Sequence, residues 1–404
     1  MSLADPPEPL HLLAACPDWN PPHPPGFTLL DRTPGTPLLE SILAAHPAGL
    51  ALDGDAPESE GLELLAAIRR CPELDATRLF LLSRSPATRA AAYALGADEC
   101  LPKPCTPEQL AEAFHQHGRF ELTFWGVRGT LPIPGPKTLK YGGNTSCVGL
   151  RIGGHRRFVF DAGTGLRLLS NHLMQTGGGR FDGRIFISHP HWDHFNSLPF
   201  FQPLYFPGNH IVLHGPPQGE RKLRNLIDDQ MDGIFFPITV GAFQAEVEYL
   251  DLWEGVHRFD GVRVEAKRLC HPGYCLAYRV DYQGRSVAYV TDNELGTRGP
   301  DDASLRELIG FLEGVDVLIH DCTYFDDEYP KRVNWGHSSI GQASRLAHEA
   351  DARYFYLFHH DPDHSDADIE RKLALAEGHL HGLGSATRCR IAGEGDSLRI
   401  DRLA

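Results

Sequence analysis

Residues 188–194 read Ser-His-Pro-His-Trp-Asp-His and directly follow the apolar run Arg-Ile-Phe-Ile, which predicts a strand. Neutral imidazole and carboxylate together suit zinc, or iron and manganese at a site with more oxygen. His189 and His191 stand two positions apart, so an extended turn lets both reach one ion. Asp193 and His194 are adjacent and point elsewhere, as a second ion requires. These side chains do not complete two coordination shells, so distant parts of the chain must supply further ligands.

The composition is that of a globular protein, with 42% hydrophobic and 23% charged residues. A chain of 404 residues predicts two domains, or three. No apolar run is long enough to span a bilayer, and the N-terminus has neither a basic region nor a cleavage site, so we expect no membrane insertion or export. The nine cysteines include no Cys-x-x-Cys pair, which favours reduced thiols and a cytoplasmic location.

The net charge is −15, and no tract of the chain is rich in lysine. This charge argues against a broad surface for extended nucleic acid, because neutralising phosphates needs clustered lysine and arginine. A small anionic substrate stays compatible with it, since bound cations reverse the local field.

The first half alternates short apolar strands with helical stretches, which is typical of a parallel sheet with helices on both faces. The expected strands are 10–15, 27–31, 49–53, 78–83 and 99–103. The expected helices are 36–46, 61–70, 85–96 and 106–114. Longer strands begin after the short junction 115–119, so we expect a doubly wound N-terminal domain at 1–117 and a second domain at 118–404.

Polar side chains stand at the ends of three predicted strands in this half. Asp53 ends the third strand and is followed by Pro57, Ser83 ends the fourth, and Lys103 with a following proline ends the fifth. In these positions and spacings the half resembles the receiver domains of response regulators. The resemblance implies phosphorylation of Asp53, with Ser83 and Lys103 beside it, and a histidine kinase or another signalling protein as partner.

The resemblance to receivers is incomplete. Receivers place an acidic pair after the first strand to hold magnesium, whereas this chain supplies only Asp18 there. The first receiver helix is replaced by the stretch 19–26, which contains too much proline to be helical. A degenerate receiver that takes no phosphate and binds a protein partner is therefore the alternative.

From residue 120 onward the chain is rich in strands, and several of them end in a potential ligand. The expected strands are 120–125, 146–152, 157–161, 184–189, 211–214, 262–269, 275–282, 286–292, 315–321 and 353–360, with helices at 304–313 and 338–350. The residues at strand ends are Asp161, His189, Asp292, His320 with Asp321, and His359 with His360. Side chains at one edge of a sheet converge on one cleft, so we expect a single site.

Four motifs carry a second resemblance: His-Pro-His-Trp-Asp-His at 189–194, Cys-His-Pro-Gly at 270–273, Thr-Asp-Asn-Glu at 291–294 and Phe-His-His-Asp-Pro at 358–362. With them, residues 120–404 resemble the metallo-β-lactamase superfamily, which implies an αββα sandwich around one or two metal ions. By this resemblance one ion is held by His189, His191 and His271. The other is held by Asp193, His194 and His359, with His360 as the reserve, and Asp292 bridges the two. Two divalent ions are expected, zinc first and manganese or iron as alternatives. Asp161 is expected to orient a ligand or its loop.

The stretch Trp-Gly-His-Ser-Ser at 335–339, followed by a helix and the strand that ends in His359, resembles the branch with ribonuclease Z and the cyclic-nucleotide phosphodiesterases. This resemblance implies a phosphodiesterase in which a metal-bridging hydroxide attacks the phosphorus. Asp193 would orient or deprotonate the water. His337, held by Asp321, would protonate the leaving oxygen or bind the phosphate. The alternative for His337 is a buried side chain that packs the start of the helix.

The expected substrate is a small phosphodiester or a nucleotide-like molecule. Transfer-RNA processing is disfavoured, because no Gly/Pro-rich basic arm is present, and the excursion 195–245 is aromatic and apolar instead. Two roles are expected for this segment: its aromatic side chains line a pocket for a flat group such as a base, or they form part of the local hydrophobic core. Two other functions remain open: hydrolysis of another ester, such as a lactone or thioester, and a signalling or interaction protein with a structural metal site.

Overall fold

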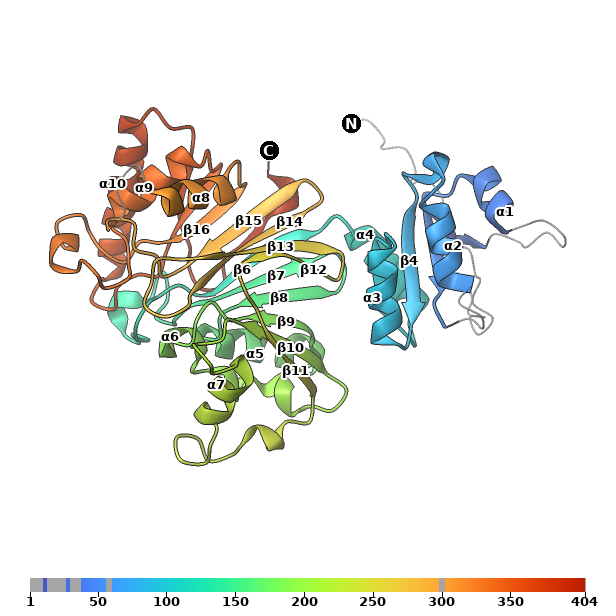
Figure 1. Cartoon of the computed structure of the whole chain (residues 1–404), viewed down its shortest axis with the longest axis horizontal. Coiled ribbons are helices and arrows are strands. Elements are labelled where there is room, and N and C mark those ends of the chain that lie inside the picture. Colours follow the sequence, from blue (N-terminus) through green and yellow to red (C-terminus); the bar gives the residue numbers. More distant parts are fainter. Residues whose placement is uncertain (1–9, 13–26, 30–37, 56–59, 298–301, 404) are drawn as a thin grey trace. The chain divides into compact units, whose positions relative to one another are not determined.

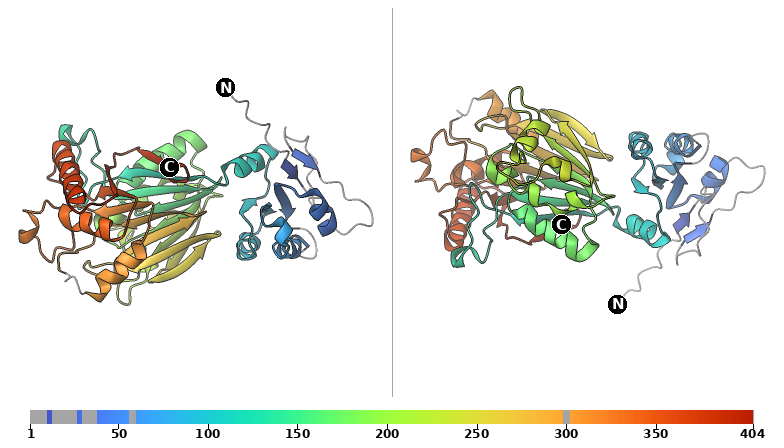
Figure 2. Two further views of the ribbon diagram at one scale, coloured as in Figure 1. Left: turned by 90° about the horizontal axis from the view of Figure 1, so that it is seen from above. Right: turned by 90° about the horizontal axis from the view of Figure 1, so that it is seen from below.

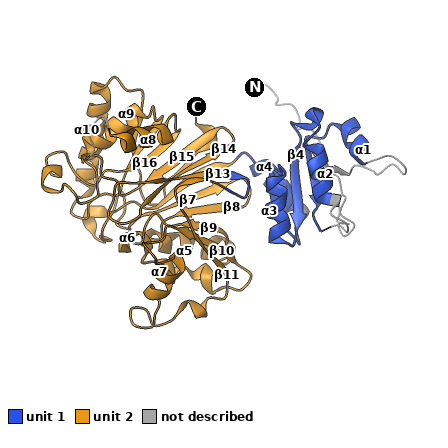
Figure 3. Cartoon of the chain, viewed as in Figure 1, with its two compact units in different colours: residues 1–118, 258–262 blue, residues 119–257, 263–404 orange. Residues whose placement is uncertain are grey.

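The computed structural model of the chain describes residues 10–12, 27–29, 38–55, 60–297 and 302–403. Two compact units divide the chain, residues 1–118 with 258–262 and residues 119–257 with 263–404 (Figure 3). Each unit buries its own apolar side chains. Within the described ranges, every helix is too short or too polar to cross a bilayer.

The N-terminal unit is built on a three-stranded parallel sheet with the order β3-β4-β5. The strands β3 (Gly49–Asp53), β4 (Arg78–Ser83) and β5 (Glu99–Pro102) are largely buried on both faces, as parallel strands between helices are. They alternate with α1 (Leu38–Ala45), α2 (Glu60–Ile68), α3 (Pro86–Ala94) and α4 (Pro107–Gln116). The predicted alternation is confirmed here, but β1 (Leu10–Leu12) and β2 (Phe27–Leu29) pair in parallel as a separate sheet of the described residues.

The side chains of Asp53, Ser83 and Lys103 lie together at the carboxyl ends of these strands. Lys103 Nζ forms an ion pair with Asp53 and lies 3.8 Å from Asp55 Oδ2, and Ser83 Oγ donates to Asp55 Oδ1 at 2.5 Å. Phosphorylation of Asp53 stays a prediction. Three features named above lie outside the described residues: Asp18, Pro57 and the stretch 19–26.

The larger unit stacks two seven-stranded sheets and carries helices on both outer faces (Figures 1 and 2). The first sheet contains β6 (Phe120–Gly126), β7 (Cys147–Ile152), β8 (Arg156–Phe160), β9 (Asp182–Phe186), β10 (His210–Gly215), β11 (Glu246–Asp251) and β19 (Ser397–Arg399). The second contains β12 (Gly255–Phe259), β13 (Val262–Arg268), β14 (Leu276–Tyr282), β15 (Arg285–Val290), β16 (Val317–Asp321), β17 (Tyr354–Phe358) and β18 (Arg388–Ile391). Their helices are α5 (Gly165–Gly177), α6 (Trp192–Phe195) and α7 (Leu223–Gln230) on one side and α8 (Ala303–Leu312), α9 (Ile340–Glu349) and α10 (Asp366–Gly382) on the other. The expected αββα sandwich is confirmed.

Aromatic side chains fill the space between the two sheets. The ring of Phe160 in β8 lies 5.6 Å from the rings of both Tyr278 in β14 and Tyr289 in β15, and Phe186 in β9 lies 5.5 Å from Tyr278. Successive residues of a strand face opposite sides of its sheet, so these rings face inward while their neighbours pack against helices. Each buried ring contributes about 2 kcal/mol, and together they hold the strand ends of both sheets at a common edge.

Several elements escaped prediction, and their sequences explain why. Helix α10 buries Lys372 on the same face as Ile369, Ala376 and Leu380, so a charge interrupts its apolar stripe. Strands β11 and β12 are the edges of their sheets, and none of their residues is fully buried, so their sequences contain no strongly apolar run.

The aromatic excursion 195–245 divides between the two roles considered for it. Phe195, Leu198 and Phe201 are buried in the core beneath the first sheet. Ile234 and Phe235 are 82% and 83% exposed. The excursion therefore supplies local core at its start and an apolar surface further on.

His210 on β10 lies between two carboxylates of the neighbouring strands. Its Nδ1 is 3.3 Å from Asp182 Oδ1 and its Nε2 is 2.7 Å from Glu248 Oε1, and the hydrogen bond to Asp182, with that to Glu248, raises the pKa of His210 to about 9. A pKa raised above the unfolded value of 6.5 stabilises the fold below pH 6.5, and this contribution is lost as the pH rises through about 9. We expect His210→Gln to lower the free energy of unfolding by about 1 kcal/mol at pH 6, since solvent screens the half-exposed carboxylates. Urea unfolding curves of the wild type and of His210→Gln should coincide at pH 10. If the free energies of unfolding differ by the same amount at pH 6 and at pH 10, this account is contradicted.

Candidate metal centre

Three residues that lie one or two positions after strands of the larger unit have left-handed backbone conformations. They are Asp161 after β8 with φ 62°, Asp292 after β15 with φ 38° and His359 after β17 with φ 55°. Residues other than glycine rarely adopt positive φ, and such strain persists only where the surrounding structure enforces it. Each turn changes the direction of its side chain at the strand end, and all three side chains are buried at one site.

The first His–Asp group consists of His189, His191, His271 and Asp292, whose nearest nitrogen and oxygen atoms all lie within 4.8 Å of one another. His271 Nε2 lies 3.0 Å from His191 Nδ1. Asp292 Oδ2 lies 3.5 Å from His189 Nε2 and 3.6 Å from His271 Nε2. His189 follows β9, His191 caps α6 and His271 stands between β13 and β14, so distant segments form this group.

The second His–Asp group consists of Asp193, His194, His359 and, again, Asp292. His359 Nε2 lies 3.1 Å from Asp193 Oδ2 and 3.2 Å from His194 Nε2. Asp292 Oδ1 lies 3.2 Å from His194 Nε2 and 3.1 Å from His359 Nε2. Asp292 therefore directs one carboxylate oxygen to each group.

His337 and Asp321 lie against both groups. His337 Nδ1 is 2.9 Å from Asp321 Oδ2 and 4.0 Å from Asp292 Oδ2, and its ring stacks on that of His359 with centroids 4.9 Å apart. Asp321 Oδ1 accepts hydrogen bonds from the Thr323 backbone nitrogen at 2.9 Å and from Thr323 Oγ1 at 2.6 Å. This carboxylate is fully buried and held on both oxygens, so it fixes the orientation of the His337 ring.

Asp161 orients His194 by contacting the ring nitrogen that faces away from the second His–Asp group. Its Oδ2 lies 2.7 Å from His194 Nδ1 and accepts from Tyr289 Oη at 2.7 Å, and its Oδ1 accepts from the Ser188 backbone nitrogen at 2.6 Å. The carboxylate leaves His194 Nε2 free to face the group, the arrangement by which outer residues orient metal-bound histidines.

Three further contributors were given no role of their own from the sequence. Two of them stand in Trp-Gly-Val-Arg-Gly-Thr at 125–130, a stretch that resembles loops lining the cleft in bacterial members of the branch with ribonuclease Z. The Thr130 backbone nitrogen donates to Asp193 Oδ2 at 2.6 Å. Gly129 passes so close to His359 that a Cβ atom there would lie 2.2 Å from its ring. Glu294, within Thr-Asp-Asn-Glu, accepts from the backbone nitrogens of Asn334 at 2.7 Å and Gly336 at 2.8 Å and so holds the loop before His337.

His360 lies next to His359 but outside both groups. Its ring is fully buried, and among the described residues neither ring nitrogen has a hydrogen-bond partner. Burial, with the charges of Lys372 and Arg128, holds its pKa well below the ordinary value, so the ring is neutral. Of the two adjacent histidines, only His359 faces the site.

Burial and neighbouring charges act differently on the histidines of the site. Burial lowers the pKa of His194, but the carboxylates of Asp193, Asp292 and Asp161 outweigh it and raise that pKa well above its ordinary value. Burial lowers the pKa of His189, His191 and His271, which keeps these imidazoles neutral, as metal ligands must be. Burial opposes protonation of His337, but the carboxylates of Asp321 and Asp292 outweigh it and raise the pKa of His337 to about 9. The rings of His189, His191 and His271 are therefore electron-pair donors, and His337 carries a proton.

The arrangement of donor atoms fits bound cations. His189 Nε2 is buried without a hydrogen-bond partner among the described residues, although it faces Asp292. His271 Nδ1 donates to the Gly336 carbonyl oxygen, so the lone pair of His271 Nε2 faces His191 Nδ1 at 3.0 Å and can be satisfied by a proton on His191 or by a cation. The two groups offer imidazole nitrogens and carboxylate oxygens and share one aspartate. These are the ligands that bind divalent metals in two-metal hydrolases.

Comparison with known proteins agrees with this geometry. The family model described as "Beta-lactamase superfamily domain" matches residues 156–360. Ribonuclease Z of Natronomonas pharaonis is 26% identical over 275 residues, which cover 59% of this chain and 86% of the relative. Ribonuclease Z of Myxococcus xanthus is 25% identical over 306 residues, which cover 65% of this chain and 93% of the relative.

Solved structures show the same fold. The metallo-beta-lactamase fold protein YhfI from Bacillus subtilis superposes with a TM-score of 0.51 at 18% identity, covering 69% of this chain and 98% of that one. A diphosphatase from the PhnP family superposes with a TM-score of 0.51 at 21% identity, and the match covers 69% of this chain and 97% of that one. Since the family model matches more than half of the chain, the chain belongs to the beta-lactamase superfamily and is a metal-dependent hydrolase.

Proposed function

We propose that the protein is a two-metal phosphodiesterase. The observation that carries this proposal is the carboxylate of Asp292, which directs one oxygen to each His–Asp group, beside the His337–Asp321 pair. A thioester hydrolase needs the cations but has no need of a proton donor so close to them, because a thiolate leaves without protonation. A lactone hydrolase would use such a donor, so the substrate assay below separates it. The ribonuclease Z relatives add support for a phosphodiester substrate.

In this proposal the first group holds one cation through His189, His191 and His271, and the second holds another through Asp193, His194 and His359, with Asp292 between them. Two divalent cations there, most favourably zinc, neutralise the charge of a phosphodiester and acidify a shared water. The nitrogen donors favour zinc, and the carboxylates of Asp193 and Asp292 leave manganese and iron as alternatives.

The protein's own residues then position the reactants. Asp193 Oδ2 is held by the Thr130 backbone nitrogen and can accept a proton from the attacking water. His337, kept protonated by Asp321, donates its proton to the leaving oxygen. Proton transfer by a positioned side chain typically accelerates a reaction by about 10²–10⁴-fold.

The proposed substrate is a small phosphodiester or nucleotide-like molecule. Although the curated relatives are named ribonuclease Z, a net charge of −15 disfavours a long RNA, whose binding needs clustered cationic side chains.

We further propose that residues 1–117 form a receiver-like regulatory or partner-binding domain and residues 118–404 the catalytic domain. The Asp53–Lys103 ion pair supports this assignment, with a histidine kinase or another signalling protein as partner.

An assay with bis-p-nitrophenyl phosphate tests the activity. The full chain loaded with zinc or manganese should release p-nitrophenol, and removal of metal with EDTA should lower the rate by at least about 10²-fold. Excess metal should restore the rate. Hydrolysis of a lactone or thioester panel without turnover of any phosphodiester would contradict the proposal.

The contact between Gly129 and His359 predicts a change in metal content. In Gly129→Ala the new methyl group would meet the His359 ring at 2.2 Å and displace it from Asp193. We expect the bound metal, measured by plasma emission spectrometry after dialysis, to fall by about one ion per chain. Gly177→Ala at the end of α5, where a Cβ meets no atom within 4 Å, is the matched control and should keep the full content. Equal metal content in both variants would contradict the role of His359.

A further inference from the structure

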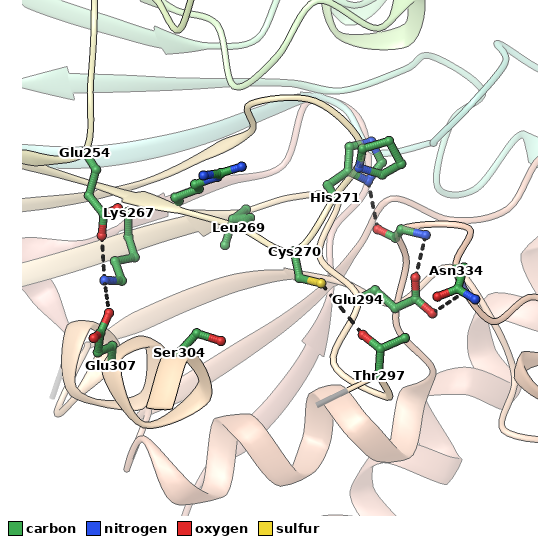
Figure 4. Close-up of a pocket in the computed structure, with 13 residues that line it drawn as sticks. Glu254, Lys267, Leu269, Cys270, His271, Glu294, Thr297, Ser304, Glu307 and Asn334 are labelled. Atoms are coloured by element: carbon green, nitrogen blue, oxygen red, sulfur yellow. Dashed lines mark hydrogen bonds and ion pairs between the residues drawn. The ribbon is translucent and has the colours of Figure 1, made fainter. Parts of the chain in front are cut away.

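A cavity of about 520 Å³ begins at the first His–Asp group and extends away from it along the end of β13. His271 lines its inner end, and Ser304 and Glu307 of α8 line the outer end (Figure 4). Ligand sites commonly have volumes of about 300–1,000 Å³, so the cavity has room for a nucleoside-sized group. A substrate held at the metal centre would extend one of its two ester substituents into this space.

The wall nearest the metal centre is rigid and polar. Glu294 is buried, and its carboxylate accepts from Tyr329 Oη at 2.7 Å as well as from the loop that contains Asn334 and Gly336. On the other side of that loop, Gly336 carbonyl oxygen lies 2.9 Å from His271 Nδ1. The cavity wall and a proposed metal ligand are therefore positioned by the same loop.

One of the two basic residues lining the cavity is already neutralised. Lys267 Nζ lies 2.5 Å from Glu254 Oε1 and 2.7 Å from Glu307 Oε2 (Figure 4). An ammonium group held between two carboxylates does not attract an anion. These groups favour hydroxyl-rich or neutral polar parts of a ligand, and they disfavour a lipid chain.

Arg268 is the other basic residue, and it is available. Within the described ranges its guanidinium makes no hydrogen bond or ion pair, and it lies 5.0 Å above the ring of Tyr274. Tyr274 in turn meets Trp253 edge to face at 5.4 Å, and Trp253 is 52% exposed. The Glu254 backbone nitrogen, next to Trp253, donates to Tyr274 Oη at 3.4 Å, which ties this aromatic pair to the rim of the cavity.

A free guanidinium and an exposed indole recognise two parts of a nucleotide. Guanidinium binds phosphate through paired N–H donors, and an exposed tryptophan stacks on a base. Arg268 and His271 are three residues apart, at most about 10 Å along the chain. A phosphate next to the scissile one in an oligonucleotide would lie within reach of the Arg268 side chain.

We infer that this cavity is the subsite for one side of the phosphodiester, and that it takes a nucleotide carrying a second phosphate. The second phosphate binds Arg268, the base stacks on Trp253, and the sugar faces the polar lining. This inference rests on the proposed phosphodiesterase function and specifies its substrate as a short, terminally phosphorylated oligonucleotide.

The test compares the dinucleotide ApA with the same molecule carrying a 5′-phosphate (pApA) or a 3′-phosphate (ApAp). For the metal-loaded full chain, kcat/KM should be about tenfold higher for one phosphorylated form than for ApA. Arg268→Ala should remove that preference, and Arg268→Lys should retain part of it. Arg345→Ala, at an exposed arginine of α9 outside the cavity, should keep the preference in full. Trp253→Ala should weaken binding of all three compounds by at least about fivefold without changing their ratio.

Each outcome has a distinct meaning. A wild-type protein that cleaves bis-p-nitrophenyl phosphate but shows no preference among the three dinucleotides would overturn the subsite and leave the phosphodiesterase. A preference that survives Arg268→Ala would also overturn it. If no phosphodiester is cleaved, the proposed function fails, and calorimetric dissociation constants of the same three compounds for wild type and Arg268→Ala still decide whether the cavity binds as inferred.

Discussion

Asp292→Asn is expected to lower kcat/KM for bis-p-nitrophenyl phosphate by about 10³-fold, the largest effect expected on this substrate. The carboxylate of Asp292 faces four histidines of the two groups, from 3.1 Å to 3.6 Å away. An amide has one oxygen and no charge, so it can neither serve both cations nor reduce the repulsion between them. The bound metal should fall from two ions per chain to one or none in plasma emission spectrometry.

Asp281→Asn is the matched control for this substitution. Asp281 is a half-buried carboxylate of β14, paired with Arg263 and Arg279 and remote from the histidines. It should keep both metal content and turnover, with at most a small change in stability. Two ions and undiminished turnover in Asp292→Asn would show that the two groups do not share this residue.

His337→Ala is expected to have an effect that depends on the leaving group. For ApA, whose sugar alkoxide needs a proton, kcat should fall by about 10²–10⁴-fold. For bis-p-nitrophenyl phosphate the fall should be below about tenfold, because p-nitrophenolate leaves without protonation. A buried residue that only packs the start of α9 would reduce both rates equally, so the ratio of the two rates separates the roles.

Asp321→Asn should follow the same pattern more weakly, since the amide can still hold the ring of His337 but no longer favours its charge. His348→Ala, in the last turn of α9, is the control for changes in that helix and should leave the ratio of rates unaltered. Equal losses on both substrates in His337→Ala would assign His337 to phosphate binding or packing.

The sequence predicts the sandwich and the side chains at its edge because these depend on local patterns. Apolar runs that end in His or Asp identify β9, β15, β16 and β17 without any tertiary information. The spacing within residues 189–194 likewise separates His189 and His191 from Asp193 and His194, and they fall into different groups in the structure.

Other features depend on contacts between residues far apart in the sequence and could not be predicted. The Thr130 backbone nitrogen and Gly129 act through their proximity to Asp193 and His359, which no local pattern encodes. The hydrogen bonds by which Glu294 holds the loop before His337, and the free guanidinium of Arg268, are visible only once neighbouring side chains are in place. The resemblance already preferred His359 with His360 as the reserve, and the turn after β17 brings only His359 into a His–Asp group.

The left-handed turns at Asp161, Asp292 and His359 have a consequence for ion capture. The left-handed main chain sets the direction of each Cα–Cβ bond, and burial and the contacts of each side chain then restrict rotation about χ1. Because little freedom remains to be lost when an ion arrives, the entropic penalty of coordination is already met by folding. We therefore expect the affinity for metal ions to depend on the stability of the two sheets as well as on the chemistry of the ligands.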